Sequence, residues 1–155
     1  MPNDAKSSKS IRAFDRSLPM VLLLAREAVM ERFRPMLRDF GVTEQQWRVL
    51  RSLEEVGAMD LGDLADSCRL LGPSLTRIVR DLEERELVHR SADQHDHRRS
   101  LISISSGGRA LIQRVGPHSE RHYREISEAI GAETLEDLYN KLEALADGLN
   151  STRSL

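Results

Sequence analysis

A change of hydrophobic period divides this chain near its middle and leaves few folds open to it. Apolar residues follow a helical spacing up to residue 82, alternate from 87 to 105, and return to a helical spacing after 109. The alternating part contains the runs LVHRS and SLISIS on either side of the polar segment ADQHDHRR, and Gly107 and Gly108 are expected to close it. The expected fold class is therefore mainly α with a small β-hairpin.

Three helices with clear start signals precede the hairpin. Thr43 is expected to cap the first helix, because Gln46 three residues later completes a capping box. Asp60 can cap the second, a short helix, and Pro73 stands where proline favours the first turn of the third. The order of elements over 43–106 predicts a winged helix-turn-helix.

The third helix carries polar residues that suit DNA on the face opposite its apolar residues. In a helix-turn-helix, the N-terminal residues of this helix contact base edges in the major groove. Here they are Ser74, Thr76 and Arg77, with Arg80 one turn later. An arginine that reads guanine discriminates by about 1–3 kcal/mol, and the hydroxyl residues are small enough for a close approach. The alternative is a solvated face on which both arginines pair with acidic residues four positions later.

The tip of the hairpin adds a second group of candidate DNA contacts, Asp96, His97, Arg98 and Arg99. A thin β-ribbon that ends in arginine can enter the minor groove, whose negative potential attracts a guanidinium. Asp96 could direct Arg98 through a charge-assisted hydrogen bond. An ordinary charged turn is the alternative, because the segment 74–99 contains six arginines and six acidic residues. DNA binding therefore requires the fold to sort these arginines toward one face.

Long apolar helices are expected on both sides of the winged segment. Pro35 should kink or interrupt the helix before it, and Gly116–Pro117 should bend the first of two helices after it. The last helix carries a narrow leucine stripe, formed by Leu135, Leu138, Leu142, Leu145 and Leu149. One chain has few elements left to cover these faces, so 11–40 and 107–150 are expected to be dimerisation helices around 43–106. The alternative is that the stripes cover the monomer's own core.

Composition argues against several other classes of protein. A net charge of -2 excludes a wholly basic DNA binder but allows a basic patch. Cys68 is the one cysteine, for which a buried thiol is the favoured role and a redox switch the alternative. His118 and His122 supply two of the three or four ligands that zinc needs, so no metal, cofactor or enzyme chemistry is expected. The absence of an export signal or an apolar run of about 20 residues favours a cytoplasmic protein, with 1–10 as a flexible terminus.

The winged segment also resembles a known family. The stretch LADSCRLLGPSLTRIVRDLEERELVHRSADQHDHRRSLISISSGGRAL at 64–111 resembles the MarR-type winged-helix regulators, most specifically in SLTRIVRDLEE and DHRR. The runs AREAVMERFRPML, TEQQWRVLRSL and LLGPSLT resemble the regulators of homoprotocatechuate (aromatic acid) degradation operons. The resemblance implies a homodimer that binds a pseudo-palindromic operator in double-stranded DNA and is released by a small ligand, often an aromatic acid. It favours a repressor of aromatic-acid catabolic genes. The alternative is a winged helix used for protein contacts, and the arginines at both the helix start and the hairpin tip argue against it.

Three positions depart from the pattern of the family. Glu86 stands where glycine is common, so the turn after the third helix is expected to close without a left-handed residue. SISSGG replaces the common LT before the next helix. Gly72 stands where the subfamily often has arginine, which removes one DNA contact.

A ligand cleft is expected where the first long helix meets the second helix and the winged segment. An aromatic carboxylate needs a flat apolar contact and a fixed guanidinium. Trp47 with Arg26 or Arg51 could supply both. The alternatives are that Trp47 packs in the core or at a dimer interface, and that Arg26 pairs with a carboxylate such as Glu27 or Glu31.

Overall fold

The elements of the computed structural model, which describes residues 11–152, follow the predicted order. They are η1 Phe14–Arg16, α1 Leu18–Asp39, α2 Glu44–Val56, β1 Met59–Asp60, α3 Leu61–Cys68, α4 Gly72–Glu84, β2 Val88–Ala92, β3 Ser100–Ile104, α5 Ser106–Ile130 and α6 Ala132–Ser151. The predicted fold class, mainly α with a small β-hairpin, is confirmed. The expectation of a flexible terminus over 1–10 lies outside the described residues.

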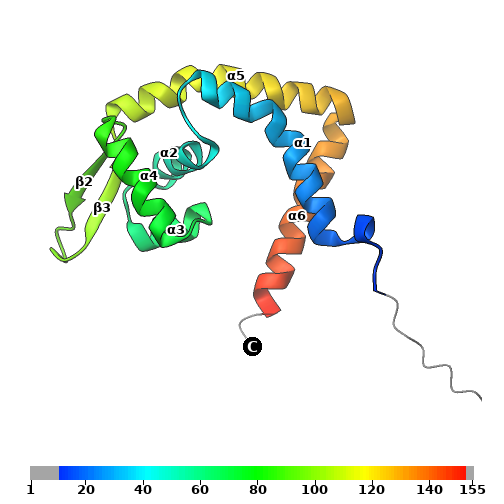
Figure 1. Ribbon diagram of the computed structural model, residues 1–155, viewed down its shortest axis with the longest axis horizontal. Helices are drawn as coiled ribbons and strands as arrows, with labels where there is room; N and C mark the ends of the chain where they lie inside the picture. Colours follow the sequence, from blue (N-terminus) through cyan, green and yellow to red (C-terminus); the bar gives the residue numbers. More distant parts are fainter. Residues whose placement is uncertain (1–10, 153–155) are drawn as a thin grey trace, which may run out of the picture.

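The molecule has two lobes that α5 connects (Figure 1). The winged lobe consists of α2, α3, α4 and the β2–β3 hairpin, and it lies under one end of α5. The terminal lobe consists of α6 and the N-terminal part of α1, and it lies under the other end. Both α1 and α6 contact α5. The long helix α5 therefore sets the position of the winged lobe relative to the terminal helices.

The hydrophobic core lies mainly in the winged lobe. α4 buries the four residues that its period predicts, Leu75, Ile78, Val79 and Leu82. Side chains of α2, α3 and the strands pack around them, together with residues from the end of α1 and the start of α5. Each large side chain buried in this way contributes about 1.5–3 kcal/mol. This packing fixes α4 with its polar face outward.

The sheet has three antiparallel strands in the order β1-β3-β2, of which the sequence predicted two. The predicted hairpin pairs Val88 with Ile104 at its base and Ala92 with Ser100 at its outer end. The additional strand β1 pairs Met59 with Ile102. Two residues are too short for a period to be visible in the sequence. Because β1 leads directly into α3, it attaches the hairpin to the helices.

The structure excludes an interruption of the helix at Pro35 and contradicts the expectation that Gly107 and Gly108 close the hairpin. Pro35 lies inside α1 and Pro117 lies inside α5, and neither proline interrupts its helix. A proline removes one backbone donor, and packing between α1 and α5 can hold the two halves of each helix together. Gly107 and Gly108 do not close the hairpin but form part of the first turn of α5, which Ser105 caps by accepting a hydrogen bond from the Gly108 N–H.

The turn after α4 closes with a left-handed residue, contrary to the expectation for Glu86. Its φ is 57°, in the region that favours glycine. The Glu86 N–H donates to the Glu83 carbonyl at 3.0 Å, and the Leu87 N–H donates to the Leu82 carbonyl at 2.9 Å. These two bonds form a Schellman motif, which requires the left-handed residue whatever its side chain.

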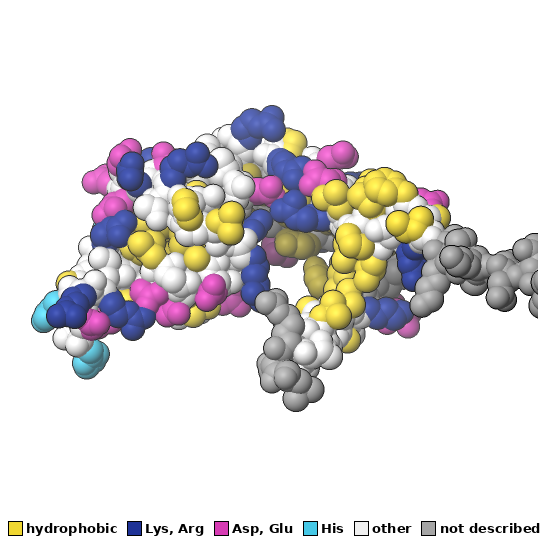
Figure 2. Space-filling model, turned by 60° about the horizontal axis from the view of Figure 1, so that its bottom comes forward, with side chains coloured by type: hydrophobic (Ala, Val, Ile, Leu, Met, Phe, Trp, Pro, Cys, Tyr) yellow, Lys and Arg dark blue, Asp and Glu magenta, His cyan; other side chains and the backbone are white. Residues whose placement is uncertain are grey.

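The terminal lobe exposes a large apolar surface. Within the described part of the chain, α6 contains no buried residue, and the leucine stripe leaves Leu138, Leu142 and Leu149 exposed by 44%, 40% and 59%. Figure 2 shows hydrophobic side chains gathered along this lobe, whereas on the winged lobe smaller hydrophobic patches lie among charged side chains. The exposed apolar residues of α1 include Leu18, Val21, Leu22, Leu23, Leu24 and Val29. The monomer's own core therefore does not cover these faces.

Candidate nucleic-acid interface and effector cavity

The polar face of α4 carries the arginines that the sequence singled out. At 100° per residue, Arg77 and Arg80 lie about 60° apart and opposite the buried apolar residues of the helix. Both side chains are exposed, and neither forms an ion pair with any residue among 11–152. The alternative pairing with Asp81 and Glu84 is therefore absent from this part of the chain. Among the described residues, these two guanidinium groups are unpaired and face solvent from the polar side of α4.

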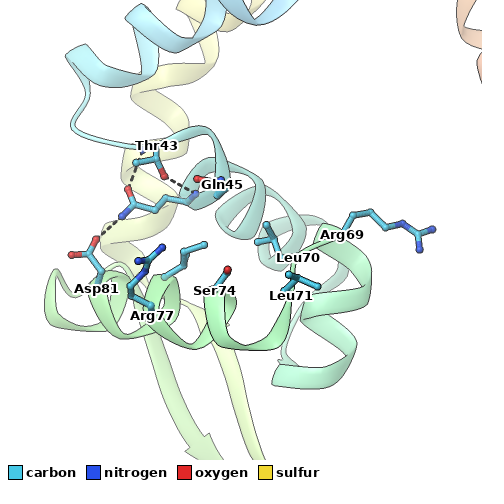
Figure 3. Close-up of a pocket in the computed structure, with 10 residues that line it drawn as sticks. Thr43, Gln45, Arg69, Leu70, Leu71, Ser74, Arg77 and Asp81 are labelled. Atoms are coloured by element: carbon cyan, nitrogen blue, oxygen red, sulfur yellow. Dashed lines mark hydrogen bonds between the residues drawn. The ribbon is translucent and has the colours of Figure 1, made fainter. Parts of the chain in front are cut away.

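A groove between α2 and α4 lies beside these arginines. It has a volume of about 520 Å³ and includes Ser74 and Arg77 of α4 in its lining, together with Thr43 of α2's N-cap (Figure 3). Gln46 donates from Nε2 to Asp81 Oδ2 at 2.5 Å, and this bond ties α2 to α4. Asp81 is thus occupied by Gln46 and leaves Arg77 free. The capping box that the sequence predicted at Thr43 is present.

Thr76 lies on the exposed face but uses its hydroxyl within the helix. Its Oγ1 donates to the Gly72 carbonyl at 3.0 Å, so the oxygen can still accept a hydrogen bond from a ligand. Ser74 is half-buried at the edge of the groove. These hydroxyl residues leave room for a duplex to approach the start of α4.

The hairpin tip differs in detail from the sequence expectation for Asp96. Asp96 Oδ1 accepts a hydrogen bond from the Arg98 backbone N–H at 3.0 Å and thereby shapes the turn rather than holding a guanidinium. Arg99 is instead the arginine held by acidic side chains, since its guanidinium pairs with Asp60 and lies 4.0 Å from Asp63. An aspartate two residues before an arginine reaches the backbone N–H more readily than the distant guanidinium. His97 is exposed at the same tip.

The fold separates the arginines of the segment 74–99 into two groups. Arg85 pairs with Asp81, Arg90 with Glu83 and Arg99 with Asp60. The other three form no ion pair with residues that the structure describes, and these are Arg77, Arg80 and Arg98. The equal numbers of basic and acidic residues therefore do not prevent an excess of free cations on α4 and at the hairpin tip.

A second cavity brings together the three residues predicted to bind a ligand. Arg26 of α1 and Trp47 and Arg51 of α2 line a cavity of about 570 Å³ that α5 also borders. α5 supplies Ser119 and Tyr123, which were not predicted from the sequence. Their helical spacing gave no sign that they face α2. The cavity thus combines an indole, a phenol and guanidinium groups.

The charges in this cavity distinguish its arginines. Arg26 pairs with Glu44 at 2.8 Å and with Glu27 at 3.3 Å, which agrees with the alternative that it serves a carboxylate of the protein. The hydrogen bond from Arg34 holds the pKa of Glu27 below its usual value, so Glu27 stays ionised. Arg51 is exposed and has no ion-pair partner within the described range. Unlike Arg26, Arg51 is therefore available to bind an anion at this cavity.

Tyr123 stands opposite α2 as a hydrogen-bond donor. Burial raises the pKa of its phenol above the ordinary value, with smaller effects from neighbouring charged and tyrosine side chains. The phenol therefore remains protonated at neutral pH and can donate to an anion.

Cys68, His118 and His122 take part in packing. Cys68 is fully buried, and burial raises the pKa of its thiol, which disfavours the reactive thiolate. His118 and His122 contact the rings of Phe40 and Phe33 at centroid distances of 5.1 and 5.4 Å. Among the described residues, no group of three or more His, Cys, Asp or Glu side chains could hold a metal ion.

The core of the winged lobe holds α4 and the β2–β3 hairpin in place. Both present arginines that are unpaired among the described residues. These features define a winged helix-turn-helix of the DNA-binding class, with α4 as its recognition helix. Comparisons with known proteins agree with this class. A family model described as "MarR family" matches residues 42–100. The chain is 40% identical to the HTH-type transcriptional regulator FarR of Neisseria gonorrhoeae over 87% of its own length and 94% of that protein.

Two further similarities concern aromatic acids. The homoprotocatechuate degradative operon repressor of Escherichia coli is 42% identical over 82% of this chain and 86% of the repressor. The crystal structure of NadR in complex with 4-hydroxyphenylacetate superposes with a TM-score of 0.75 and 37% identity, covering 94% of this chain and 98% of NadR. This chain belongs to the MarR family, whose members named here are transcriptional regulators rather than enzymes. None of the helices in the described range is long and apolar enough to cross a membrane.

Proposed function

We propose that this chain is a cytoplasmic homodimeric repressor of aromatic-acid catabolic genes. It binds a pseudo-palindromic operator in double-stranded DNA and is released by a small aromatic carboxylate. The observation that carries this proposal is that Trp47 and the unpaired Arg51 line one cavity on α2, the helix that also contacts α4. Similarity to a repressor of homoprotocatechuate degradation and to NadR, crystallised with 4-hydroxyphenylacetate, supports the same ligand class.

The DNA contacts fall into two groups. Ser74, Thr76, Arg77 and Arg80 face the major groove from α4, where the arginines read guanine edges or contact phosphates. Arg98 reaches the minor groove or its phosphates from the hairpin tip. His97 contacts DNA beside Arg98, whereas Asp96 and Arg99 support the tip, because Asp96 caps its turn and Arg99 ties it to Asp60. This arrangement gives both specific and non-specific affinity.

A second copy of the chain covers the exposed faces of α1 and α6. A two-fold dimer built in this way places the two copies of α4 about one DNA turn apart, roughly 34 Å, or a multiple of it. A pseudo-palindromic operator matches that symmetry. The large apolar surface of the terminal lobe supports this assembly.

The effector occupies the cavity between α1, α2 and α5. The ring of an aromatic acid lies against Trp47, and its carboxylate accepts hydrogen bonds from Arg51 and Tyr123. The ligand separates or rotates α2 relative to α1 and α5, and the Gln46–Asp81 bond carries that movement to α4. The spacing between the two copies of α4 in the dimer then no longer matches the spacing of the operator half-sites.

The test begins with selection of bound duplexes from a random-sequence DNA pool, which identifies the operator directly. Fluorescence anisotropy then measures operator affinity for the wild type, Arg77→Ala and Arg51→Gln, with and without 4-hydroxyphenylacetate. Arg77→Ala should weaken specific binding by about 1–3 kcal/mol, because it removes a base contact. Arg51→Gln should bind the operator normally but resist release by the ligand. Unchanged affinity in Arg77→Ala, or no release by any aromatic acid, contradicts the corresponding part of the proposal.

A further inference from the structure

Arg69 borders both of the cavities described above. It lines the groove between α2 and α4 together with Ser74 and Arg77, and it also lines the effector cavity that holds Trp47 and Arg51. Among the described residues that line these cavities, no other is shared by the two. Arg69 therefore stands on the ridge between the DNA-facing groove and the effector cavity.

The backbone of Arg69 is held firmly at this ridge. It ends α3 in the left-handed conformation, with φ 52° and ψ 48°. The Leu70 N–H donates to the Ala65 carbonyl at 3.0 Å, and Nη1 of Arg48 donates to the Cys68 carbonyl at 2.9 Å. These bonds close the end of α3 and fix the direction in which the Arg69 side chain leaves the turn.

The side chain of Arg69 remains available. It is exposed, and its guanidinium forms no ion pair with any residue among 11–152. Figure 3 shows it extending away from Ser74 and Arg77. Gly72 provides no side chain at the start of α4, so Arg69 and Arg77 are the cations that flank this helix start in the sequence.

We propose that Arg69 couples the two sites: its guanidinium pairs with a DNA phosphate in the operator complex and with the ligand carboxylate when the effector cavity is occupied. This inference rests on the proposed function and adds a residue to it. One guanidinium cannot face both cavities at once, so each binding event withdraws a cation from the other. A carboxylate in a half-enclosed cavity is screened less than a phosphate at the surface, which favours the ligand when both are present. The coupling is reciprocal, as linkage requires.

The test compares Arg69→Gln with the wild type. Glutamine has a Cβ like arginine, so it experiences the same left-handed strain and isolates the loss of charge. Arg38→Gln is the matched control, because Arg38 is an exposed arginine of α1 that lines neither cavity. Thermal unfolding of each variant establishes that the fold is retained, and Arg69→Lys keeps the charge.

Operator affinity is measured over a series of salt concentrations with and without 4-hydroxyphenylacetate, and ligand affinity of the DNA-free protein is measured by calorimetry. Arg69→Gln should bind the operator several-fold more weakly, with the salt slope reduced by about one per protomer. It should also bind the ligand more weakly and show a smaller ratio of operator Kd values with and without ligand. Arg69→Lys should restore the salt slope, and Arg38→Gln should match the wild type.

Three outcomes would contradict this inference, and only the first also contradicts the proposed function. A wild type that ignores 4-hydroxyphenylacetate contradicts the proposed function together with the inference. A responsive wild type beside an equally responsive Arg69→Gln contradicts the inference alone. A reduced salt slope with an unchanged Kd ratio makes Arg69 a simple phosphate contact and likewise overturns the coupling.

Discussion

At the residue scale, Glu86 is the position where α4 turns into the hairpin with a φ of 57°. A left-handed conformation costs a residue with a Cβ about 1–2 kcal/mol, and glycine avoids that cost but loses more entropy on folding. Glu86→Gly should therefore raise the free energy of unfolding by about 0.5–1 kcal/mol. Urea unfolding at a fixed protein concentration measures the change.

Glu86→Ala is the control for that prediction. Alanine also carries a Cβ, so the strain remains and stability should stay close to that of the wild type. A Glu86→Gly protein no more stable than Glu86→Ala would show that the Schellman bonds at Glu83 and Leu82 relieve the strain.

Some contacts of single residues could be predicted from the sequence and others could not. Thr43, Gln46 and Asp60 were identified as helix caps because capping depends on residues within one turn, and the structure has those bonds. The pair between Arg99 and Asp60 was missed, since it depends on the pairing of β1 with β3. Partners far apart in the sequence leave no local signal, and the choice between Arg26 and Arg51 in the effector cavity depended on such a partner, Glu44.

At the element scale, the start of α5 depends on the absence of a side chain at Gly108. A Cβ there would lie 2.3 Å from the Leu87 carbonyl oxygen and 2.6 Å from Ile104 Cγ1. Because the Leu87 oxygen belongs to the backbone just before β2 and cannot rotate away, Gly108→Ala should push α5 away from the hairpin. The expected loss of stability is about 1–3 kcal/mol, the usual cost of overpacking, with weaker operator binding as the hairpin shifts.

Gly116→Ala provides a matched control in the same helix, because a Cβ at Gly116 meets nothing within 4 Å. Replacing a glycine inside a helix should stabilise the protein by about 0.5–1 kcal/mol. A loss of stability in Gly108→Ala beside a gain in Gly116→Ala would distinguish the cost of the close contact from the effect of helix propensity. Equal effects in the two variants would contradict the close approach at Gly108.

Periodicity identified every long helix at this scale, because each presents several apolar residues to one face. It could not find β1, whose two residues pair with β3. Gly107 and Gly108 were predicted to form a turn, because glycine pairs favour turns locally. Their place at the start of α5 depends on the contact with Leu87, which arises only in the folded protein.

At the scale of the whole molecule, the winged lobe has a closed core whereas the terminal lobe exposes its apolar faces. Leu138 and Leu142 of α6 belong to that exposed surface. If a second copy covers it, two glutamates at these positions must be buried without partners. The double variant Leu138→Glu with Leu142→Glu should therefore sediment as a monomer at micromolar concentration, where the wild type sediments as a dimer.

The same double variant should also lose specific DNA binding, although the two substitutions lie in the terminal lobe. A monomer presents one α4 to the operator, so it loses the contacts of the second half-site and should bind close to the non-specific level. Asn140→Glu, on the opposite face of α6, adds a charge without touching the apolar surface and should remain a dimer that binds the operator. Circular dichroism separates a folded monomer from an unfolded chain. A wild type that is monomeric at micromolar concentration, or a double variant that still dimerises, contradicts this assembly. Something other than a second copy would then cover the leucine stripe.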